Sequence, residues 1–536
     1  MQEKPKSPAR KRIASLSSAA VLLMTATLVG QLLGFLRTKL VNANFDPIGP
    51  QSTDAYFAAF TIPDLFFYTL AAGALGVAFM PVLAERFHRG DRKGMWELSS
   101  SLLNLLSIVM LGVAVIIFVF ARPLISTLVA PNLTPEQLDN AVAIMRLLAL
   151  NPLFFTISGV LSSAQQTMGR FFFFAIAPLF YNLSIIVSIY LFRDTSIGLV
   201  GLGYGAFAGG LLQMIIIALG LTGTKFTWRP KIIWRNSDFR TILKQLPPRS
   251  LDQGIDQVQS IVETNLANRL GAGFVSYYSN AYTLHTAPIL LLGTAISTAA
   301  FPRLNKRLAQ GRPDLFRKDF LSILRLMIWL AIPVVIICFF ARGYLARLIF
   351  SRNAPEIALI FGFLTVAIFF RTVYTLISRW FYAQKDSKTP LLVSVFVIGL
   401  NVALATWLAR PGNYGVAGLA MAQSIAAAVE VVLLVSLMFI RDTSFFTAQF
   451  WGALLRMVSV TGFTVLTAFV VVSFYPLEGT DRGIVTLGAK LMLIALSTFF
   501  VYVGISGLFG LDEARPIYRW LKRIITKPMR IQYWNT

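Results

Sequence analysis

The stretches GQLLGFLRTKLVNANF (Gly30–Phe45) and STDAYFAAFTIPDLFFYTLAAGALGVAFMPVLAER (Ser52–Arg86) decide the fold class of this chain. The first predicts a membrane-spanning helix that carries Arg37. The second predicts a helix that is interrupted by a proline and by a glycine and contains Asp54 and Asp64. Hydrocarbon has no water for a charge or a broken backbone, so such features face protein or a wet cavity. We therefore predict that this pair lines a pathway; the alternative is that Arg37 and Asp54 flank a loop at the membrane surface.

The composition indicates a polytopic membrane protein. Of the 536 residues, 56% are hydrophobic and only 13% are charged, too few to cover a soluble core of this size. The net charge of +24 comes from basic residues in short loops between apolar runs, which is the positive-inside pattern and argues against nucleic-acid binding. With one cysteine, Cys338, and two histidines, we expect no disulfide and no metal cluster.

The apolar runs predict about fourteen membrane spans, each of roughly 20 residues or more. They fall at 16–41, 53–86, 98–121, 138–167, 171–193, 197–221, 243–269, 276–302, 318–341, 355–383, 390–409, 414–440, 447–474 and 484–509. Lys and Arg gather after the even-numbered spans, so both termini are predicted to be cytoplasmic. The exception follows the ninth span, where Arg342, Arg347 and Arg352 suggest a short interfacial helix.

An internal repeat predicts two lobes. The segment Ser162–Asn182 aligns with Phe381–Asn401 at one offset, with matching Ala-Gln pairs and a matching asparagine. Both copies follow an even-numbered span, so the repeat has parallel topology, which in transporters places the substrate between the lobes. We predict an N-terminal lobe over 1–222, a C-terminal lobe over 223–440, two further helices over 441–510 and a basic cytoplasmic tail over 511–536.

The seventh predicted span carries the densest charge within the membrane. Asp252, Asp256, Gln259 and Glu263 fall on one helix face at about 100° per residue, with Arg249 close by. Such a stripe could bind a cation, take up a proton or position Arg249 against a phosphate. The alternative is that Asp252 and Asp256 sit near the cytoplasmic end and only pair with Arg249.

Other polar residues lie in later spans. Arg371 and Arg379 are candidate internal cations, although Arg379 could instead pair with Asp386 or with lipid headgroups. His285 could titrate near neutral pH, but a single histidine is more often a satisfied structural group. Asn401, at the end of the second repeat copy, joins the candidate ion-coupling residues.

The sequence does not favour an enzyme. It has no G-x-x-x-x-G-K-[ST] phosphate loop, no Ser/His/Asp arrangement and no metal-ligand spacing. A membrane-embedded transferase would place its carboxylates and histidines in polar loops at one surface, whereas the acids here lie within spans. A transporter fits this pattern better.

Several motifs resemble one known family over nearly the whole chain, the MurJ/MviN lipid II flippases of the multidrug/oligosaccharidyl-lipid/polysaccharide exporter superfamily. The resemblance rests on GFLR, TDAYFAAFTIPDL, GALGVAFMPVLAERF, GTAISTAAFPRLNK and RWFYAQKDSKTP, which begin at Gly34, Thr53, Gly73, Gly293 and Arg379.

This resemblance implies a function in the bacterial inner membrane. The cargo would be undecaprenyl-pyrophosphate-linked disaccharide-pentapeptide, moved from the inner to the outer leaflet by alternating access under a membrane potential or ion gradient. The family implies a cationic central cavity whose arginines meet the pyrophosphate, and a groove for the lipid tail along the last two helices. No cofactor is expected beyond Na⁺ or H⁺ as coupling ion. The implied partners are lipid II, anionic lipids and cell-wall synthesis proteins, with the chain itself a monomer.

The family's site residues carry over incompletely. Arg37 and Asp54 are kept, and Glu263 resembles the seventh-helix acid that forms part of a sodium site in some members. Three expected arginines are replaced by Gln31, Phe67 and Thr283. Either Arg249, Arg371 or Arg379 substitutes for them, or the cargo differs, or the chain is a divergent paralogue.

We therefore predict a lipid II flippase. Arg37 contacts the pyrophosphate, with Gln31 and Asp64 in the same substrate set, and Asp54 helps to gate the outer side. Asp252, Asp256 and Glu263 shape coupling. The alternatives are an exporter of another polyprenyl-linked oligosaccharide and a transport-inactive membrane scaffold for cell-wall synthesis.

Overall fold

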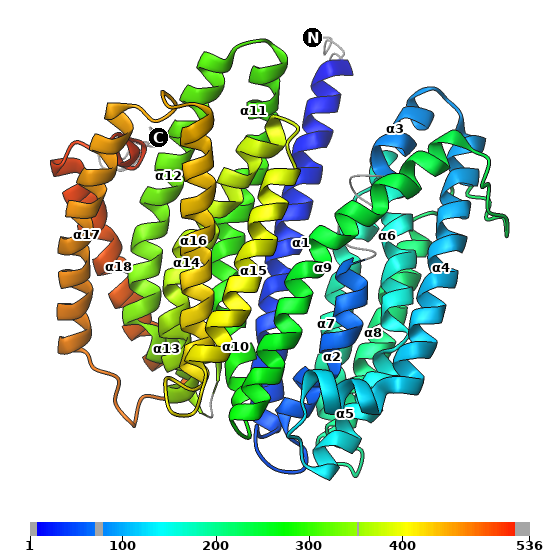
Figure 1. Ribbon diagram of the computed structural model, residues 1–536, viewed down its shortest axis with the longest axis horizontal. Coiled ribbons are helices and arrows are strands. Elements are labelled where there is room, and N and C mark those ends of the chain that lie inside the picture. The colour runs from blue at the N-terminus through cyan, green and yellow to red at the C-terminus, as the bar shows by residue number, and fades with distance from the viewer. Residues whose placement is uncertain (1–7, 70–78, 351–352, 520–536) are drawn as a thin grey trace, which may run out of the picture. The chain divides into compact units, whose positions relative to one another are not determined.

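The computed structural model describes residues 8–69, 79–350 and 353–519, without the side chains of 8–21, 245 and 247–253. The described residues form helices joined by short loops, and no strand occurs among them (Figure 1). The predicted all-α polytopic fold is therefore confirmed. The predicted interruption at Gly73, the side chains of Arg249 and Asp252, and Arg352 lie outside the described residues.

The helices follow one another along the chain with few long connections. The first nine are α1 (Pro8–Asn44), α2 (Thr53–Phe67), α3 (Met80–His88), α4 (Arg92–Pro123), α5 (Pro135–Leu148), α6 (Asn151–Thr167), α7 (Phe172–Phe192), α8 (Val200–Leu219) and α9 (Ser237–Leu270). The rest are α10 (Phe274–Pro288), α11 (Ala295–Ala309), α12 (Pro313–Phe340), α13 (Arg342–Ile349), α14 (Ala354–Ala383), α15 (Lys388–Leu408), α16 (Val416–Arg441), α17 (Ala448–Phe474) and α18 (Gly483–Leu508). Three short turns complete the set: π-helical η3 (Leu124–Val129) and η4 (Ile289–Thr294), and 3₁₀-helical η5 (Asp512–Ala514).

Within the described ranges 8–69, 79–350 and 353–519, each predicted span falls largely on helix. Among the described residues, 11 helical segments are long and apolar enough to cross a membrane. The other three predicted spans fall on α1, on α2 with α3, and on α9. The helix predicted after the ninth span is present as α13, which carries Arg342 and Arg347.

Prolines and capping side chains set several helix ends. Thr134 and Gln137 form a reciprocal capping box at the start of α5, which satisfies backbone N–H groups that have no partner in the first turn. Pro123 and Pro288 each directly precede a π-helical turn, because a proline cannot donate to the regular hydrogen-bond ladder. The predicted span at 138–167 is two helices, broken at 149–150 just before Pro152.

The chain divides into two compact units. Unit 1 comprises residues 1–280, 350–352 and 402–419, and unit 2 comprises 281–349, 353–401 and 420–536. The predicted lobe boundaries at 222 and 440, and a twofold relation between the lobes, stay predictions. Both repeat copies nevertheless occupy the same kind of element: each runs from the end of one helix through a turn into the next, from α6 into α7 and from α14 into α15.

In unit 1, α7 and α8 pack so closely that side chains larger than hydrogen do not fit between them. A Cβ atom on Gly201 would lie 2.2 Å from Phe192, and one on Gly205 would lie 2.1 Å from the hydroxyl of Ser188. Small residues at a membrane helix interface allow this close backbone approach. Gly201, Gly205 and Gly209 thus form the side of α8 that packs on α7, whereas Gly203 faces α5 and Gly210 faces α6.

In unit 2, α17 and α18 lie side by side at one edge and pack against α12 (Figure 1). A polar brace joins α12 to α18: the indole N–H of Trp329 donates to the Ser506 hydroxyl over 3.0 Å, and the Tyr502 hydroxyl donates to the Trp329 carbonyl over 2.8 Å. The chain then turns at η5, where the Glu513 carboxylate lies 2.6 Å from the Arg325 guanidinium.

The turn between α14 and α15 contains the motif RWFYAQKDSKTP, and Asp386 holds it together. Its carboxylate accepts from the Thr389 backbone N–H over 3.0 Å and from the Thr389 hydroxyl over 2.6 Å, capping α15. Arg441 donates to the same carboxylate over 2.8 Å and stacks on the Phe381 ring at 5.1 Å. Partial burial acts to raise the pKa of Asp386, but the Thr389 and Arg441 hydrogen bonds outweigh it and lower that pKa to about 2.

We predict that Asp386→Ala lowers the free energy of unfolding by about 1–2 kcal/mol at pH 7, because a helix cap and an ion pair are both lost. The folded-state pKa lies below the ordinary value of 3.8, so the stabilisation is complete above that pH and is lost as the pH falls towards about 2. Thermal unfolding of the detergent-solubilised protein between pH 7 and pH 3 measures the gap between wild type and variant. Ser387→Ala, at the exposed neighbouring side chain, is the control. A gap that does not shrink on acidification would contradict this role of the carboxylate.

Candidate functional site

Asp54 joins the start of α2 to the start of α10. It is 2% exposed, and its carboxylate accepts from the Gly273 N–H over 2.7 Å and from the Ser276 N–H over 2.8 Å. The Ser276 hydroxyl donates to it over 2.5 Å and lies 2.7 Å from the Thr53 hydroxyl. A carboxylate at a helix N-terminus satisfies free N–H groups and meets the positive end of the helix dipole. Asp54 is therefore a buried tether rather than a surface loop charge.

A pair of asparagines extends this tether to α1. Asn42 donates its amide N–H to the Asn280 side-chain oxygen over 3.1 Å, and Asn280 donates back over 2.7 Å. Both side chains are buried. We call Asn42, Thr53, Asp54, Ser276 and Asn280 the polar latch, because they hold the end of α1 and the starts of α2 and α10 together within unit 1.

Arg37 lies on α1, away from its end, and is half-buried. It interacts electrostatically with Asp64 on α2, with Tyr56 on the same helix and with Tyr181 on α7. Pro63, which is buried, precedes Asp64 inside α2. The structure thus brings Arg37 and Asp64 close enough to interact electrostatically, and a pathway lined by them stays a prediction.

Glu263 on α9 is buried within a hydrogen-bonded set. One carboxylate oxygen accepts from the Gln259 amide over 2.8 Å and the other from the Tyr278 hydroxyl over 2.9 Å. Gln259 and Glu263 are each 5% exposed, whereas Asp256 is exposed. Of the predicted stripe, the part nearest the end of α9 faces protein.

In unit 2, Arg371 on α14 is paired rather than open. Its guanidinium donates to the Glu430 carboxylate of α16 over 2.9 Å, and Ser394 of α15 donates to the other Glu430 oxygen over 2.8 Å. Glu430 is 2% exposed. His285 is also buried and interacts electrostatically with Arg371, and neither of its ring nitrogens has a hydrogen-bond partner among the described residues. It is therefore not the satisfied structural group that a lone histidine usually is.

The remaining candidates occupy separate places in unit 2. The Arg379 guanidinium lies 4.9 Å from the centre of the Phe301 ring and 3.5 Å from the Thr298 hydroxyl. Asp386 forms its ion pair with Arg441 instead of Arg379. Asn401 donates its amide to the Gln423 side chain over 3.2 Å.

The positions of the three missing arginines differ in their surroundings. Gln31 is exposed on α1. Phe67 packs its ring at 5.0 Å from that of Phe155 on α6, so an aromatic cluster fills this place. Thr283 is half-buried on α10.

Most of the charged residues within the helices could be identified from the sequence, whereas the side chains that bond to them could not. Asn42, Ser276, Asn280 and Glu430 were not among the candidates. Glu430 stands in an otherwise apolar run, and that alone could have marked it as needing an internal cation.

A bundle of long apolar helices with arginines and carboxylates paired inside it defines the class of polytopic membrane transporters. Within that class, the chain belongs to the lipid II flippase MurJ family, whose model matches residues 50–480.

Curated relatives and solved structures agree with this assignment. A probable lipid II flippase MurJ of Bdellovibrio bacteriovorus is 24% identical over 519 residues, which are 94% of this chain and 96% of that protein. The lipid II flippase MurJ of Burkholderia cenocepacia is 26% identical over 434 residues, covering 76% and 81% respectively. A solved lipid II flippase MurJ in an inward closed conformation aligns with a TM-score of 0.74 at 22% identity over 94% of this chain and 100% of that one. A MATE family transporter in an inward-facing conformation aligns with a TM-score of 0.65 at 16% identity over 80% and 98%. The structural matches establish the shared fold.

We predict that Glu430→Ala lowers the free energy of unfolding by about 3–5 kcal/mol, because it leaves the Arg371 charge buried without its carboxylate. The double variant Arg371→Met/Glu430→Leu should recover most of that loss, since no charge is then stranded. Unfolding in detergent micelles measures both, with Glu356→Ala, at an exposed position on α14, as the control. A double variant as unstable as Glu430→Ala would show that the pair is not the source of the loss.

Proposed function

We propose that this protein translocates lipid II, the undecaprenyl-pyrophosphate-linked peptidoglycan precursor, across the cytoplasmic membrane. The observation that carries the proposal is the family match over residues 50–480 together with an internal Arg37. In the proposed arrangement the protein is a monomer of the bacterial inner membrane with both termini in the cytoplasm.

Arg37 is the proposed contact for the pyrophosphate. An arginine presents planar donors that match phosphate oxygens, and it stays charged at any physiological pH. In the cargo-free protein Asp64 balances part of its charge, so the pyrophosphate would compete with this carboxylate for the guanidinium. Gln31 could add an amide donor further along α1. Such competition favours release as well as capture, which a transporter needs.

The polar latch is the proposed gate on the outer side. With the termini in the cytoplasm, the end of α1 and the start of α2 face outward, so the latch closes that side. Its contacts are neutral hydrogen bonds and hydrogen bonds to the Asp54 carboxylate, each worth about 0.5–3 kcal/mol, and a small number of them can open reversibly. Opening the latch would let the headgroup leave towards the outer leaflet by alternating access.

Coupling to Na⁺ or H⁺ is proposed at the α9 acids. Glu263 has both oxygens occupied by Gln259 and Tyr278, and an incoming ion or proton would exchange with these donors. Asp252, Asp256 and Asn401 belong to the same proposal. Glu430 neutralises the charge of Arg371, so Arg371 is proposed only as a secondary substrate contact. Arg379 and Arg249 are proposed as further secondary contacts.

A second candidate cargo is favoured by one observation. Phe67 places an aromatic ring where the family resemblance implies an arginine, and it packs against Phe155. A cavity with fewer cations and more rings suits another polyprenyl-linked oligosaccharide.

Rescue of a bacterium depleted of its own lipid II flippase tests the proposal. We expect the wild-type chain to restore growth and outer-leaflet lipid II, Arg37→Ala to lose at least tenfold of the transport, and Arg37→Lys to lie between them because it keeps charge without the fork. Arg312→Gln, at an exposed pair with Asp314, is the matched control.

Rescue that does not depend on Arg37 would remove this residue from the substrate site. No rescue by wild-type protein that is present in the membrane would instead favour another lipid-linked cargo or a scaffold role. Binding to a panel of polyprenyl-linked sugars then separates these two.

We also predict that a covalent latch blocks transport. Thr53→Cys and Ser276→Cys replace hydroxyls 2.7 Å apart, close enough for a disulfide after small adjustment. In a Cys338→Ala background, oxidation should abolish lipid II transport and a reducing agent should restore it. Each single cysteine variant controls for loss of the hydroxyl. Full transport by the oxidised double variant would exclude this gate.

A further inference from the structure

Arg146 on α5 lies on an apolar, exposed surface of unit 1. It stands about 16 Å along the helix axis from Pro135, where α5 begins, at 1.5 Å per residue. The side chain of a helical residue leans back towards the start of its helix, so the guanidinium lies nearer to the 124–134 connection than the Arg146 Cα atom does. The side chain is exposed, and the exposed neighbours Val115, Phe118 and Tyr204 are apolar or aromatic.

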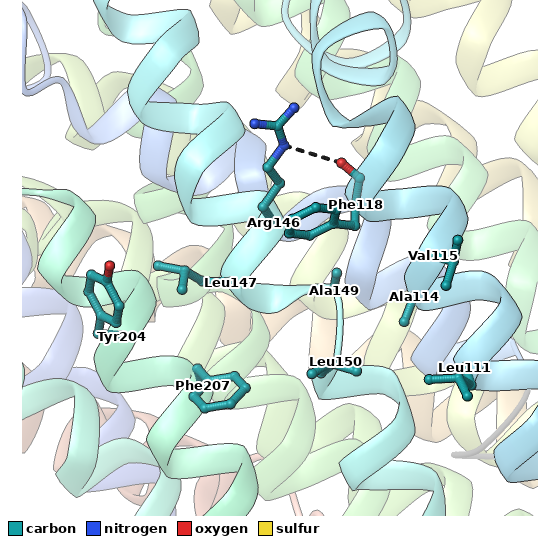
Figure 2. A pocket seen from close by; sticks show the side chains of 10 residues that line it. All are labelled: Leu111, Ala114, Val115, Phe118, Arg146, Leu147, Ala149, Leu150, Tyr204 and Phe207. Carbon is teal, nitrogen blue, oxygen red and sulfur yellow. Dashed lines mark hydrogen bonds between the residues drawn. The ribbon is translucent and has the colours of Figure 1, made fainter.

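These residues line a groove of about 410 Å³ formed by α4, α5, the α5–α6 connection and α8 (Figure 2). One wall is α4, the opposite wall is α8, and the α5–α6 connection lies between them, as the close-up shows. The groove exists because α5 ends at Leu148 and the chain restarts at Asn151, which leaves room above Ala149 and Leu150. The lining residues are Leu111, Ala114, Val115, Phe118, Arg146, Leu147, Ala149, Leu150, Tyr204 and Phe207.

The charge of Arg146 is only partly accommodated by the protein. Its Nε–H donates to the Phe118 carbonyl over 3.2 Å, and the guanidinium lies 5.4 Å from the centre of the Phe118 ring. A guanidinium carries five N–H donors. Among the described residues, no carboxylate forms an ion pair with Arg146. The nearest acid along α5, Asp139, is paired with Arg122. A cation left in this setting calls for an anion from the surroundings.

The groove has a polar end and an apolar end. Arg146 and Phe118 lie towards the 124–134 connection between α4 and α5, whereas Leu111 and Leu150 lie further into the spans. A helical side chain leans towards the N-terminus of its helix, so the Arg146 guanidinium is directed to the same end. This polarity matches an amphiphile whose anionic head is at the membrane surface and whose chain points to the bilayer centre.

We propose that this groove binds one anionic phospholipid from the leaflet on the side of the 124–134 connection. The phosphate accepts from Arg146, and one acyl chain lies against Leu111, Val115 and Leu150. The Tyr204 hydroxyl on the opposite wall is placed to donate to an ester carbonyl (Figure 2). An anionic head is favoured over a zwitterionic one because a choline ammonium would be repelled by the guanidinium. This site shares no residue with the polar latch or with Arg37.

Native mass spectrometry of the full chain tests the proposal, with equal amounts of phosphatidylglycerol and phosphatidylcholine that carry the same acyl chains. We expect the wild type to retain one phosphatidylglycerol in preference to phosphatidylcholine. Arg146→Gln should bind phosphatidylglycerol about fivefold more weakly and lose the preference, because one basic side chain near a headgroup accounts for that factor. Arg122→Gln removes an equally exposed arginine of the same region that is already paired, and it should change nothing.

Two further variants keep the test decisive. Arg146→Lys keeps the charge and should keep the preference even if Arg146→Gln folds poorly. Val115→Trp fills the groove while Arg146 remains, and it should displace both lipids. Equal retention of the two lipids by the wild type, an unchanged Arg146→Gln, or a second copy of this chain bound in place of lipid would overturn the proposal.

Discussion

A polar group inside a membrane-spanning helix must find its partner within the protein, and this requirement organises the chain. Asp54 meets it at the backbone of α10, Glu263 at Gln259 and Tyr278, and Glu430 at Arg371 and Ser394. The contact between Gln259 and Glu263 lies within α9, but each of the three carboxylates also bonds to at least one other helix. The buried charges therefore specify which helices associate, a task for which apolar side chains in lipid are poorly suited because lipid tails are equally apolar.

The same requirement separates the residues that hold the fold from those that can act on a substrate. A carboxylate whose oxygens are both bonded to fixed donors, such as Asp54, holds helices together. Arg37 interacts electrostatically with Asp64 and with two tyrosines, Tyr56 and Tyr181. Arg371, in contrast, is already bonded to a buried acid. Arginines that look equivalent in the sequence thus differ in how strongly they are already bonded to a carboxylate of the protein.

Much of the helical fold could be predicted from the sequence, because long apolar runs and the caps around them are local signals. The length of the 138–167 run allows a bend, but its position at 149–150 could not be predicted, since neither residue there is a recognised helix breaker and only Pro152 marks the restart. At the site, Arg37, Asp54 and Glu263 were visible as charges in apolar surroundings. Their partners were not, because Ser276 and Asn280 are ordinary polar residues whose role depends on contacts with residues more than two hundred positions away. Glu430 was missed for the same reason: its need for a cation is local, but the identity of Arg371 as that cation is not.

The seam between α7 and α8 has a mechanical consequence. Sliding α7 along α8 would drive Phe192 or Ser188 into the α8 backbone at Gly201 or Gly205, so we expect the two helices to move together. Bending within unit 1 is then left to places with broken ladders, such as the proline in α2 and the gap between α5 and α6. If α7 and α8 rotate together about such a break, a small rotation there displaces the far ends of the two helices by a larger distance.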